Sequence, residues 1–479
     1  MPRSRPAASV ALSGLLLACS SPGTVSPDAG AHPRDTGFVS DSTHVESGAA
    51  DAGHDAGQPD AHDSRDTGVA TDARGDGSSG HHAASAIEHL VLIVQENHSF
   101  DNYFGLYCTA ATGSNPTCNA GPACCEAAPA MDPSGATPVT LDDSTNSTYN
   151  PNHVQACELQ EIDNGKMDKF VTGTSCSSAG NLAYAGSAAV GGYWQLAAGG
   201  ALADRYFQPI AGASTSNDMY LARAKFVFLD DDYEAPSKGA FCQGGAEMSY
   251  TDPTIADLLL ATGGTFGVYA AGYAASVGAS PECPPISPAC PAQVGGYPCS
   301  YDPGDIPFEY FPSLRDNPLY MKDFTQLASD LSGNALPDFA FVKAIGYLTE
   351  HPGFGDTISG GQTFVQGVID AVEASPYAAN TLILITWDES GGYFDHIAPP
   401  PTSPVDSEPY GARIPLLAVG PFAKKNYVSH VTMEHSSVVT FVEWNWLGQQ
   451  TGQLLTRDAV VHNIGSLLDP TATVVGVPE

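Results

Sequence analysis

The sequence predicts an α/β fold in which helices cover both faces of a mostly parallel β-sheet. Several short apolar runs are continuous rather than alternating, which is typical of strands buried on both faces. In addition, apolar residues at helical spacing separate two of these runs, so that strand, helix and strand follow one another as in a βαβ unit. Both observations indicate an α/β/α sandwich.

The predicted core strands are four apolar runs, at residues 90–94, 339–342, 381–386 and 416–419. Between the second and third runs, the apolar positions recur every three or four residues: Phe364, Val365, Val368, Ile369 and Val372. This spacing predicts a helix with one buried face. The segment 339–386 is therefore expected to be one βαβ unit.

The N-terminus has the pattern of an export signal. Arg3 and Arg5 precede a short apolar run that ends at Cys19, which predicts a signal peptide over residues 1–19. The run is too short to span a bilayer. The sequence Leu-Leu-Ala-Cys at residues 16–19 resembles a bacterial lipobox, so a lipid anchor at Cys19 is expected, with an ordinary signal peptide as the alternative. The protein is then exported, either to the cell envelope as a lipoprotein or as a secreted protein.

Residues 20–84 contain almost no large apolar side chain, and the tripeptides Asp-Ala-Gly and Asp-Thr-Gly recur there. Such a segment cannot bury enough surface to offset the entropy of ordering, so we expect a disordered acidic linker. The remainder, residues 85–479, is expected to form one folded domain.

The net charge of the chain excludes some classes of binding partner. The chain carries 53 acidic and 18 basic side chains, for a formal net charge of −35. Nucleic acid is excluded as a partner because binding it requires a basic surface. Anionic lipid is disfavoured for the same reason, so a membrane contact is expected only through Cys19. A phosphorylated substrate remains compatible, because a bound cation can reverse the local field.

Cysteine usage is also informative. Without Cys19, ten cysteines remain, all between residues 108 and 299. An even number in an exported chain predicts up to five disulfides. We therefore expect loop-rich insertions held by bridges, and the connectivity stays open.

Polar side chains follow two of the predicted strands. Glu96 and Asn97 come shortly after the first run, and Asp388 and Glu389 come shortly after the third. Ligands bind outside the carboxyl ends of the strands in open α/β sheets, so these four side chains are expected at one edge. Three carboxylates and an amide oxygen would hold a divalent metal ion. The alternative is that they are solvated or cap helices.

Longer motifs resemble the bacterial phosphoesterase family, which contains phospholipases C and a group of acid phosphatases. The resemblance extends from about residue 86 to 450. Its motifs are ENHSFDNYFG at residues 96–105, EHP at 350–352, TWDESGGYFDHIAPP at 386–400, RIP at 413–415 and HSS at 435–437. It implies an alkaline-phosphatase-like α/β/α sandwich and hydrolysis of phosphoric esters at a metal ion. In that case Glu96, Asn97, Asp388 and Glu389 are the metal ligands, and residues 85–479 are the catalytic domain.

In the family a Ser or Thr attacks phosphorus beside the metal. Aligning Gly212, Asn217 and Tyr220 with the family pattern assigns this role, and a further metal contact, to Ser214. The hydrolysis would then pass through a phosphoseryl intermediate. The segment departs from the usual pattern, with Ala213 and Ser216 in place of two prolines and Asp218 in place of a common arginine, so Thr215 stays an alternative.

The same resemblance assigns phosphate binding or general acid catalysis to His153, His351 and His396. It places Lys166 and Asp168 near the site. The expected cofactor is one or more divalent ions of Ca, Mg, Mn or Zn, and the oligomeric state stays open.

Three functions remain to be compared. The first is an acid-phosphatase-like hydrolase of phosphate esters, favoured because only about thirty residues follow Gly448 and the further domains of the phospholipases C have no room. The second is a diesterase of the phospholipase C type. The third is a catalytically degenerate, surface-binding lipoprotein. A serine protease is disfavoured because residues 388–392, which superficially match its nucleophile segment, follow a buried parallel strand and have Glu389 in place of a small residue. A lipase-type hydrolase is disfavoured because no G-x-S-x-G motif occurs.

Overall fold

The computed structural model describes residues 81–286, 290, 297–472 and 476–479. The predicted signal peptide, the lipobox cysteine Cys19 and residues 20–80 of the predicted linker lie outside the described residues. The ordered contacts begin slightly before the expected boundary at residue 85, because Ala84 N donates a hydrogen bond to Asn445 O over 2.6 Å.

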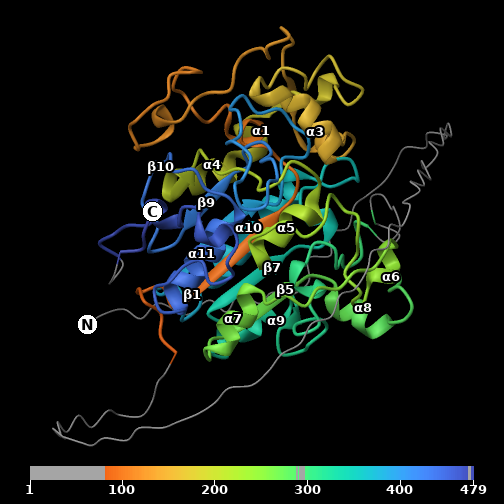
Figure 1. Cartoon of the computed structure of the whole chain (residues 1–479), viewed down its shortest axis with the longest axis vertical. Helices are drawn as coiled ribbons and strands as arrows, with labels where there is room; N and C mark the ends of the chain where they lie inside the picture. The colour runs from red at the N-terminus through yellow and green to blue at the C-terminus, as the bar shows by residue number, and fades with distance from the viewer. Residues whose placement is uncertain (1–80, 287–289, 291–296, 473–475) are drawn as a thin grey trace, which may run out of the picture. The chain divides into compact units, whose positions relative to one another are not determined.

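An eight-stranded sheet forms the centre of the fold (Figure 1). Its strand order is β10-β4-β9-β8-β1-β7-β5-β6. The strands are β1 (His89–Gln95), β4 (Ala201–Ala203), β5 (Phe266–Ala270), β6 (Met321–Asp323), β7 (Phe339–Lys343), β8 (Thr381–Trp387), β9 (Leu416–Val419) and β10 (Tyr427–Ser429). A separate two-stranded sheet pairs β2 (Val139–Leu141) with β3 (Ala183–Ala185).

The predicted α/β fold with a mostly parallel sheet is confirmed. All four predicted runs are strands: they correspond to β1, β7, β8 and β9. The expectation of parallel pairing was wrong for β9, which runs antiparallel to both β8 and β4. Its continuous apolar run reflects burial on both faces, which a central antiparallel strand experiences just as a parallel one does.

Alternate residues of β1 face two separate cores. Leu90, Leu92 and Val94 belong to one cluster of buried side chains, and Val91 and Ile93 belong to another. Side chains of a strand alternate between the faces of the sheet, so β1 needs apolar residues at every position. This explains why the run is continuous.

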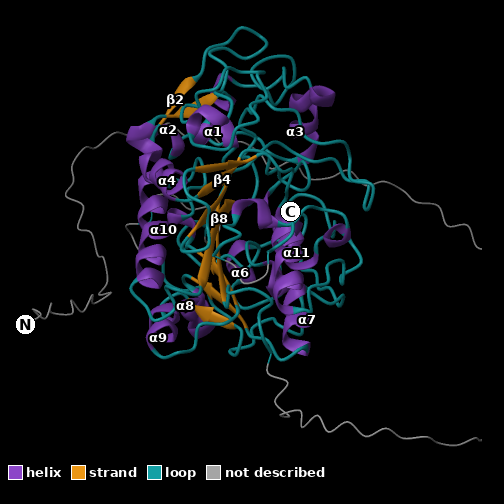
Figure 2. Cartoon of the chain, turned by 90° about the vertical axis from the view of Figure 1, so that its left-hand side faces the viewer, coloured by secondary structure: helices purple, strands orange, loops and turns teal. Residues whose placement is uncertain are grey.

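Helices cover both faces of the sheet (Figure 2). The first core contains buried residues of α5 (Ser214–Arg223), α7 (Ile255–Ala261) and α11 (His435–Trp446). The second contains residues of α4 (Ser187–Gly199), α9 (Gln326–Ser332) and α10 (Ile358–Glu373). The helix α10 is the one predicted from its spacing, and it connects β7 to the parallel strand β8 across β1.

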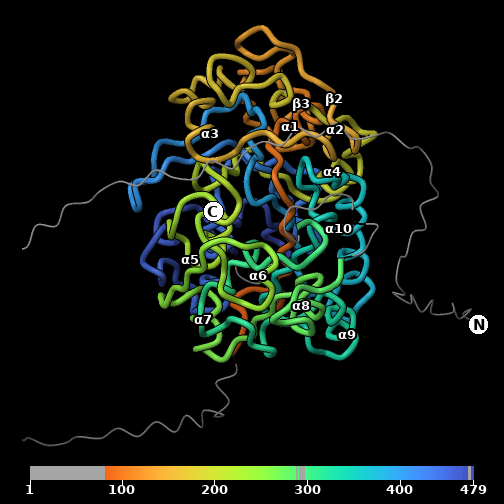
Figure 3. Tube along the Cα trace, turned by 90° about the vertical axis from the view of Figure 1, so that its right-hand side faces the viewer, coloured from red at the N-terminus to blue at the C-terminus, as the bar shows by residue number. Residues whose placement is uncertain are grey.

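A loop-rich region lies beyond the carboxyl end of β1 (Figure 3). It contains α1 (Phe100–Phe104), α2 (Asp143–Asn146), α3 (Gln155–Ile162) and the small sheet. The remaining helices, α6 (Ala240–Gln243) and α8 (Tyr273–Ala279), lie in a second insertion. None of the described helices is long and apolar enough to cross a membrane.

Disulfides hold these insertions, as the cysteine count predicted. The five bridges are Cys108–Cys125, Cys118–Cys124, Cys157–Cys176, Cys242–Cys283 and Cys290–Cys299. Bridges of this number are typical of proteins that fold in an oxidising compartment outside the cytoplasm.

Candidate active site

Two neighbouring strands deliver polar side chains to one edge of the sheet. Strands β1 and β8 pair in parallel up to their last residues, Gln95 and Trp387. The chain segments that follow them therefore leave the sheet side by side. Asn97 N donates a hydrogen bond to Asp388 Oδ1 over 3.1 Å, which fixes one segment against the other.

The Asn97 side chain lies at the centre of this group. Its Nδ2 donates hydrogen bonds to Glu389 Oε1 and, over 3.4 Å, to Ser214 Oγ. The backbone of Asn97 has φ of 64°, a left-handed conformation that asparagine tolerates better than most residues. The Ser214 hydroxyl also lies near Asp388, whose pKa it lowers against the effect of burial. The structure thus brings Asn97, Asp388, Glu389 and Ser214 together.

The two hydroxyls considered as nucleophile lie differently. Ser214 is the first residue of α5, and its side chain faces Asn97 and Asp388. The backbone N–H of Thr215 donates to Asp231 Oδ1 over 2.9 Å, and its hydroxyl oxygen lies 3.7 Å from the position that a Cβ atom on Gly304 would occupy. Ser214 is therefore the hydroxyl that contacts the group of polar side chains.

Two of the three predicted histidines border this group. His153 Nδ1 donates to Pro151 O over 3.0 Å, which leaves Nε2 to accept from Asn97 Nδ2 at 3.5 Å. The rings of His153 and His351 lie 6.0 Å apart. Burial lowers the pKa of His351 to about 4 even though the charge of Glu96 opposes this shift.

Glu96 has partners of its own at the same edge. Its Oε1 lies 2.5 Å from Nζ of Lys343, the last residue of β7, and its Oε2 accepts from Tyr297 Oη over 3.1 Å. Burial alone would raise the pKa of Glu96, but Lys343 and His351 lower it to about 2. Glu96 therefore stays ionised, and Lys343 compensates its charge.

Unpaired oxygens test whether a metal ion fits here. Asn97 Oδ1 and Asp388 Oδ2 are buried and have no hydrogen-bond partner among the described residues. Both carboxylate oxygens of the fully buried Asp218, on α5, are also unpaired. Burial, with Glu96 close by, raises the pKa of Asp388 to about 7. Unpaired buried oxygens of this kind are the ligands that hard divalent cations prefer, so the residues fit a metal ion.

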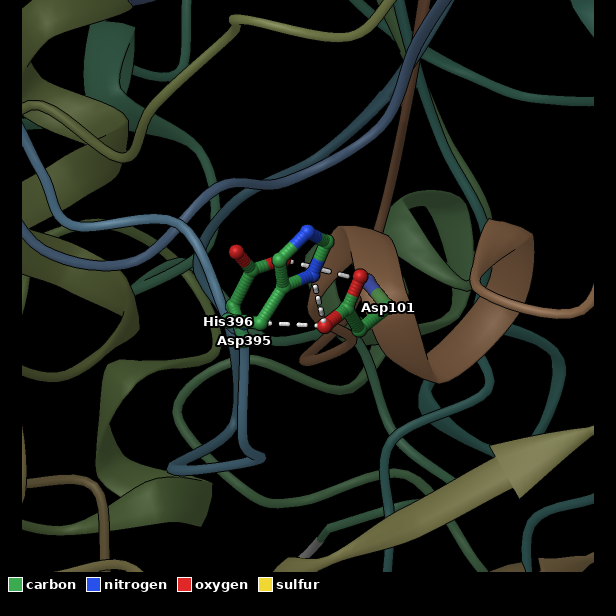
Figure 4. Close-up of side chains that lie close together, drawn as sticks. All are labelled: Asp101, Asp395 and His396. Carbon is green, nitrogen blue, oxygen red and sulfur yellow. Dashed lines mark hydrogen bonds and ion pairs between the residues drawn. The ribbon is translucent and has the colours of Figure 1, made fainter. Parts of the chain in front are cut away.

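The third predicted histidine, His396, lies in a different group. Asp101 on α1, Asp395 and His396 have ligand atoms within 4.8 Å of one another, a spacing that could hold a metal ion. His396 Nδ1 lies 2.7 Å from Asp101 Oδ2 (Figure 4). His396 Nε2 lies 3.4 Å from Glu126, so the ring contacts two carboxylates and not the Asn97 side chain.

An arginine already lies inside this second group. Arg413 donates from Nε to Asp395 Oδ1 over 2.8 Å and from Nη2 to Asp101 Oδ1 over 3.0 Å. Its guanidinium also lies 4.4 Å from the centre of the Phe100 ring. All four carboxylate oxygens of Asp101 and Asp395 have hydrogen-bond partners. The counter-charge here is therefore a side chain of the protein.

Sequence reasoning missed several residues of the site. Lys343 could have been noticed as a charged residue that ends a buried apolar run. Tyr297 and Asp218 carry no such signal, because their contacts depend on tertiary structure. Of the two further residues placed near the site, Lys166 is largely exposed and pairs with Asp163 over 2.7 Å, and Asp168 has one buried oxygen without a hydrogen-bond partner among the described residues.

The fold and site define an α/β protein in which an amide and carboxylates follow two parallel strands and contact a hydroxyl at the start of α5. A family model matches residues 87–447, and its description is the Phosphoesterase family. The chain therefore belongs to the Phosphoesterase family.

Two phospholipases C are similar to this chain along most of its length. A non-hemolytic phospholipase C of Pseudomonas aeruginosa is 24% identical over 414 residues, which cover 74% of this chain and 53% of the relative. Non-specific phospholipase C3 of Arabidopsis thaliana is 22% identical over 463 residues, which cover 84% of this chain and 78% of the relative. The chain spans about half the length of the bacterial relative.

Among solved structures, an alkaline phosphatase superfamily protein of Vibrio parahaemolyticus has a TM-score of 0.30 and 11% identity. The similarity covers 64% of this chain and 70% of that chain.

Proposed function

We propose that the protein is a metal-dependent phosphoric ester hydrolase whose nucleophile is Ser214. The observation that carries the proposal is the position of Asn97, whose side chain contacts the Ser214 hydroxyl and Glu389 while its backbone binds Asp388. A hydroxyl surrounded by oxygen ligands is the arrangement that phosphoryl transfer to a serine requires.

Each residue has a defined task in this hydrolysis. The oxygen of Ser214 attacks phosphorus, and its proton passes toward the nearby carboxylate of Asp388. The bond from phosphorus to the leaving oxygen breaks, and that oxygen takes a proton from Nε2 of His153 or His351. Each ring acts in this way only when both of its nitrogens are protonated, which the lowered pKa of His351 disfavours. Water then attacks the phosphoseryl group and gives one proton to the histidine. The bond from phosphorus to Ser214 Oγ breaks, that oxygen takes its proton back from Asp388, and the phosphate product leaves.

The metal ion is assigned to Asn97, Asp388, Glu389 and Ser214, with Glu96 as a further ligand. Its identity stays open among Ca, Mg, Mn and Zn. When bound, it would lower the pKa of the attacking hydroxyl and neutralise charge on the phosphoryl oxygens. The unpaired oxygens of Asn97 and Asp388 support this assignment.

The substrate we propose is a phosphodiester of the kind that phospholipases C cleave. The relatives described above carry that name, which favours the diesterase over the phosphate monoesterase that the sequence first suggested. The retained hydroxyl and carboxylates disfavour a degenerate binding protein. We also propose export of the chain, with a lipid anchor at Cys19 and a linker ahead of the catalytic domain.

The test compares two chromogenic esters. The full chain, produced in an oxidising compartment, is assayed with para-nitrophenyl phosphorylcholine and with para-nitrophenyl phosphate, before and after chelation and after addition of Mn²⁺ or Ca²⁺. We expect release from the diester, loss of release with chelator, and recovery with metal.

Ser214→Ala should reduce the rate by at least about 10³-fold because it removes the nucleophile. Thr215→Ala is the matched control, one residue along the same helix, and should keep most of the activity. Release from the monoester alone would replace the diester with a monoester substrate. Full activity of Ser214→Ala would refute the proposed mechanism.

A further inference from the structure

A buried carboxylate connects the two halves of the candidate site. Glu158, on α3, is 2% exposed. Its Oε2 accepts hydrogen bonds from Gly212 N and Gln208 Nε2, each over 2.8 Å, and its Oε1 accepts from Ser390 Oγ over 3.1 Å. All three partners are donors and oppose the effect of burial, which nevertheless raises the pKa of Glu158 to about 8.

The partners of Glu158 lie directly beside the residues of the site. Gly212 is two residues before Ser214, and Ser390 follows Glu389. Ser390 N also donates to Gln208 Oε1 over 2.9 Å. Glu158 and Gln208 thus tie the segment that carries the nucleophile to the loop that follows β8.

The segment that carries Ser214 depends on such outside support. Ala213 precedes α5 and has no side chain that could cap it. Gly212 has φ of 141°, and a Cβ atom there would lie 2.7 Å from Asp230 Oδ1. Its amide is held by Glu158, and the amide of Ala213 donates to Asp230 Oδ1 over 3.0 Å. The position of the Ser214 hydroxyl is therefore set by carboxylates from other parts of the chain.

The helix that presents Glu158 is itself fixed. Cys157 precedes Glu158 on α3 and is bridged to Cys176. The backbone N–H of Gln155, the first residue of α3, donates to Asp230 Oδ1 over 2.8 Å. Asp230 therefore binds α3 and the Ser214 segment with the same oxygen, which holds Glu158 in place.

We propose that Glu158 is a positioning residue that keeps the Ser214 segment and the Asp388–Glu389 loop at the separation needed for catalysis. The proposal deepens the proposed function and rests on it for its catalytic consequence. Glu158 does not contact the substrate in this assignment; it acts through Gly212, Gln208 and Ser390. A displacement of about 1 Å at such a site costs roughly 100-fold in rate.

The test uses two substitutions of Glu158 and a matched control. Glu158→Ala removes all three hydrogen bonds and should lower kcat by about 100-fold with a smaller change in KM. Glu158→Gln keeps one acceptor for Gly212 and Gln208 and can donate to Ser390 Oγ, so it should restore kcat to within about tenfold. Glu161→Ala is the control: Glu161 is also buried on α3, but it accepts from Asn181 over 2.7 Å.

A second readout does not depend on turnover. Hydrogen–deuterium exchange of the peptide that covers residues 209–220 should become faster in Glu158→Ala and stay unchanged in Glu158→Gln and Glu161→Ala. If the protein hydrolyses neither ester, the proposed function fails while the exchange experiment still decides whether Glu158 fixes the segment. If Glu158→Ala does not fold, Ser390→Ala, which removes one hydrogen bond, should lower kcat severalfold.

Two results would overturn the proposal. One is a wild-type kcat in folded Glu158→Ala, or in Ser390→Ala where Glu158→Ala does not fold. The other is a decrease in kcat of Glu161→Ala as large as that of Glu158→Ala, because this would reflect general loss of stability.

Discussion

The same two chain segments, those after β1 and β8, build two buried acidic groups with opposite properties. Asn97, Asp388 and Glu389 form one group, in which buried oxygens remain without a partner. Asp101 and Asp395 form the other, together with His396, and there Arg413 pairs with both carboxylates. The difference lies in the source of the positive charge.

Residue type alone does not distinguish a metal site from an ion-pair network. Carboxylates a few residues apart serve both groups, and the second group has the more compact spacing of ligand atoms. The presence of Arg413 decides the matter, because a guanidinium and a metal ion would compete for the same oxygens. In the first group Lys343 pairs with Glu96, but buried oxygens of Asn97 and Asp388 keep no partner among the described residues, so we expect metal to bind there.

The largest expected effect is on the first group. Asp388→Asn should lower the diesterase rate by about 10³-fold, because it removes charge beside the nucleophile. It should also weaken Mn²⁺ binding in isothermal titration calorimetry. Asp395→Asn is the matched control and should leave Mn²⁺ affinity unchanged. Equal loss of Mn²⁺ binding in both variants would mean that the two groups do not differ as we infer.

A smaller effect is expected from removing the internal cation. Arg413→Met should lower the free energy of unfolding by about 3–5 kcal/mol, because Asp101 and Asp395 would be buried without compensation. Urea denaturation measures this change. Arg205→Met, which removes a partly exposed arginine 3.9 Å from Glu126, should cost less than about 1 kcal/mol. Similar losses in both variants would contradict the assigned role of Arg413.

The smallest effect concerns pH. Burial alone would lower the pKa of His396, but the charge and hydrogen bond of Asp101 outweigh it and raise the pKa. A folded-state pKa above the unfolded value means that protonated His396 stabilises the protein at pH below about 6.5. This contribution is lost as the pH rises through the folded-state pKa.

In His396→Gln the free energy of unfolding should therefore fall less steeply above about pH 6.5. At low pH it should be lower than in the wild type by on the order of 1 kcal/mol. Denaturation curves measured between pH 5 and 9 give the result. An unchanged pH profile in His396→Gln would show that the ring is neutral throughout this range.

The sequence alone predicted the central part of the sheet well. Strands β1, β7, β8 and β9 each bury nearly every side chain, so their apolar runs are evident. The other four strands of this sheet, β4, β5, β6 and β10, were missed; three of them have only three residues, as in Ala201–Ala203, and carry no periodic signal. The direction of β9 was also not predictable from burial alone.

For the site, the sequence predicted which residues meet at the strand ends but not what supports them. Asn97 and Asp388 follow long apolar runs, and that pattern places them. Glu158, on α3, and Tyr297 contact the site from positions far away in sequence, and no local pattern encodes such contacts. The distinction between His351 and His396 likewise depends on tertiary neighbours, Glu96 in one case and Asp101 in the other.

The five disulfides all lie outside the described strands of the sheet. None of the described strands contains a cysteine, and each bridge joins two Cα atoms that lie 5.0–5.9 Å apart. Each bridged loop therefore begins and ends at nearly the same place, whatever its length. Such a loop can therefore change in length or sequence without moving the points at which it joins the rest of the fold, and the sheet need not change with it.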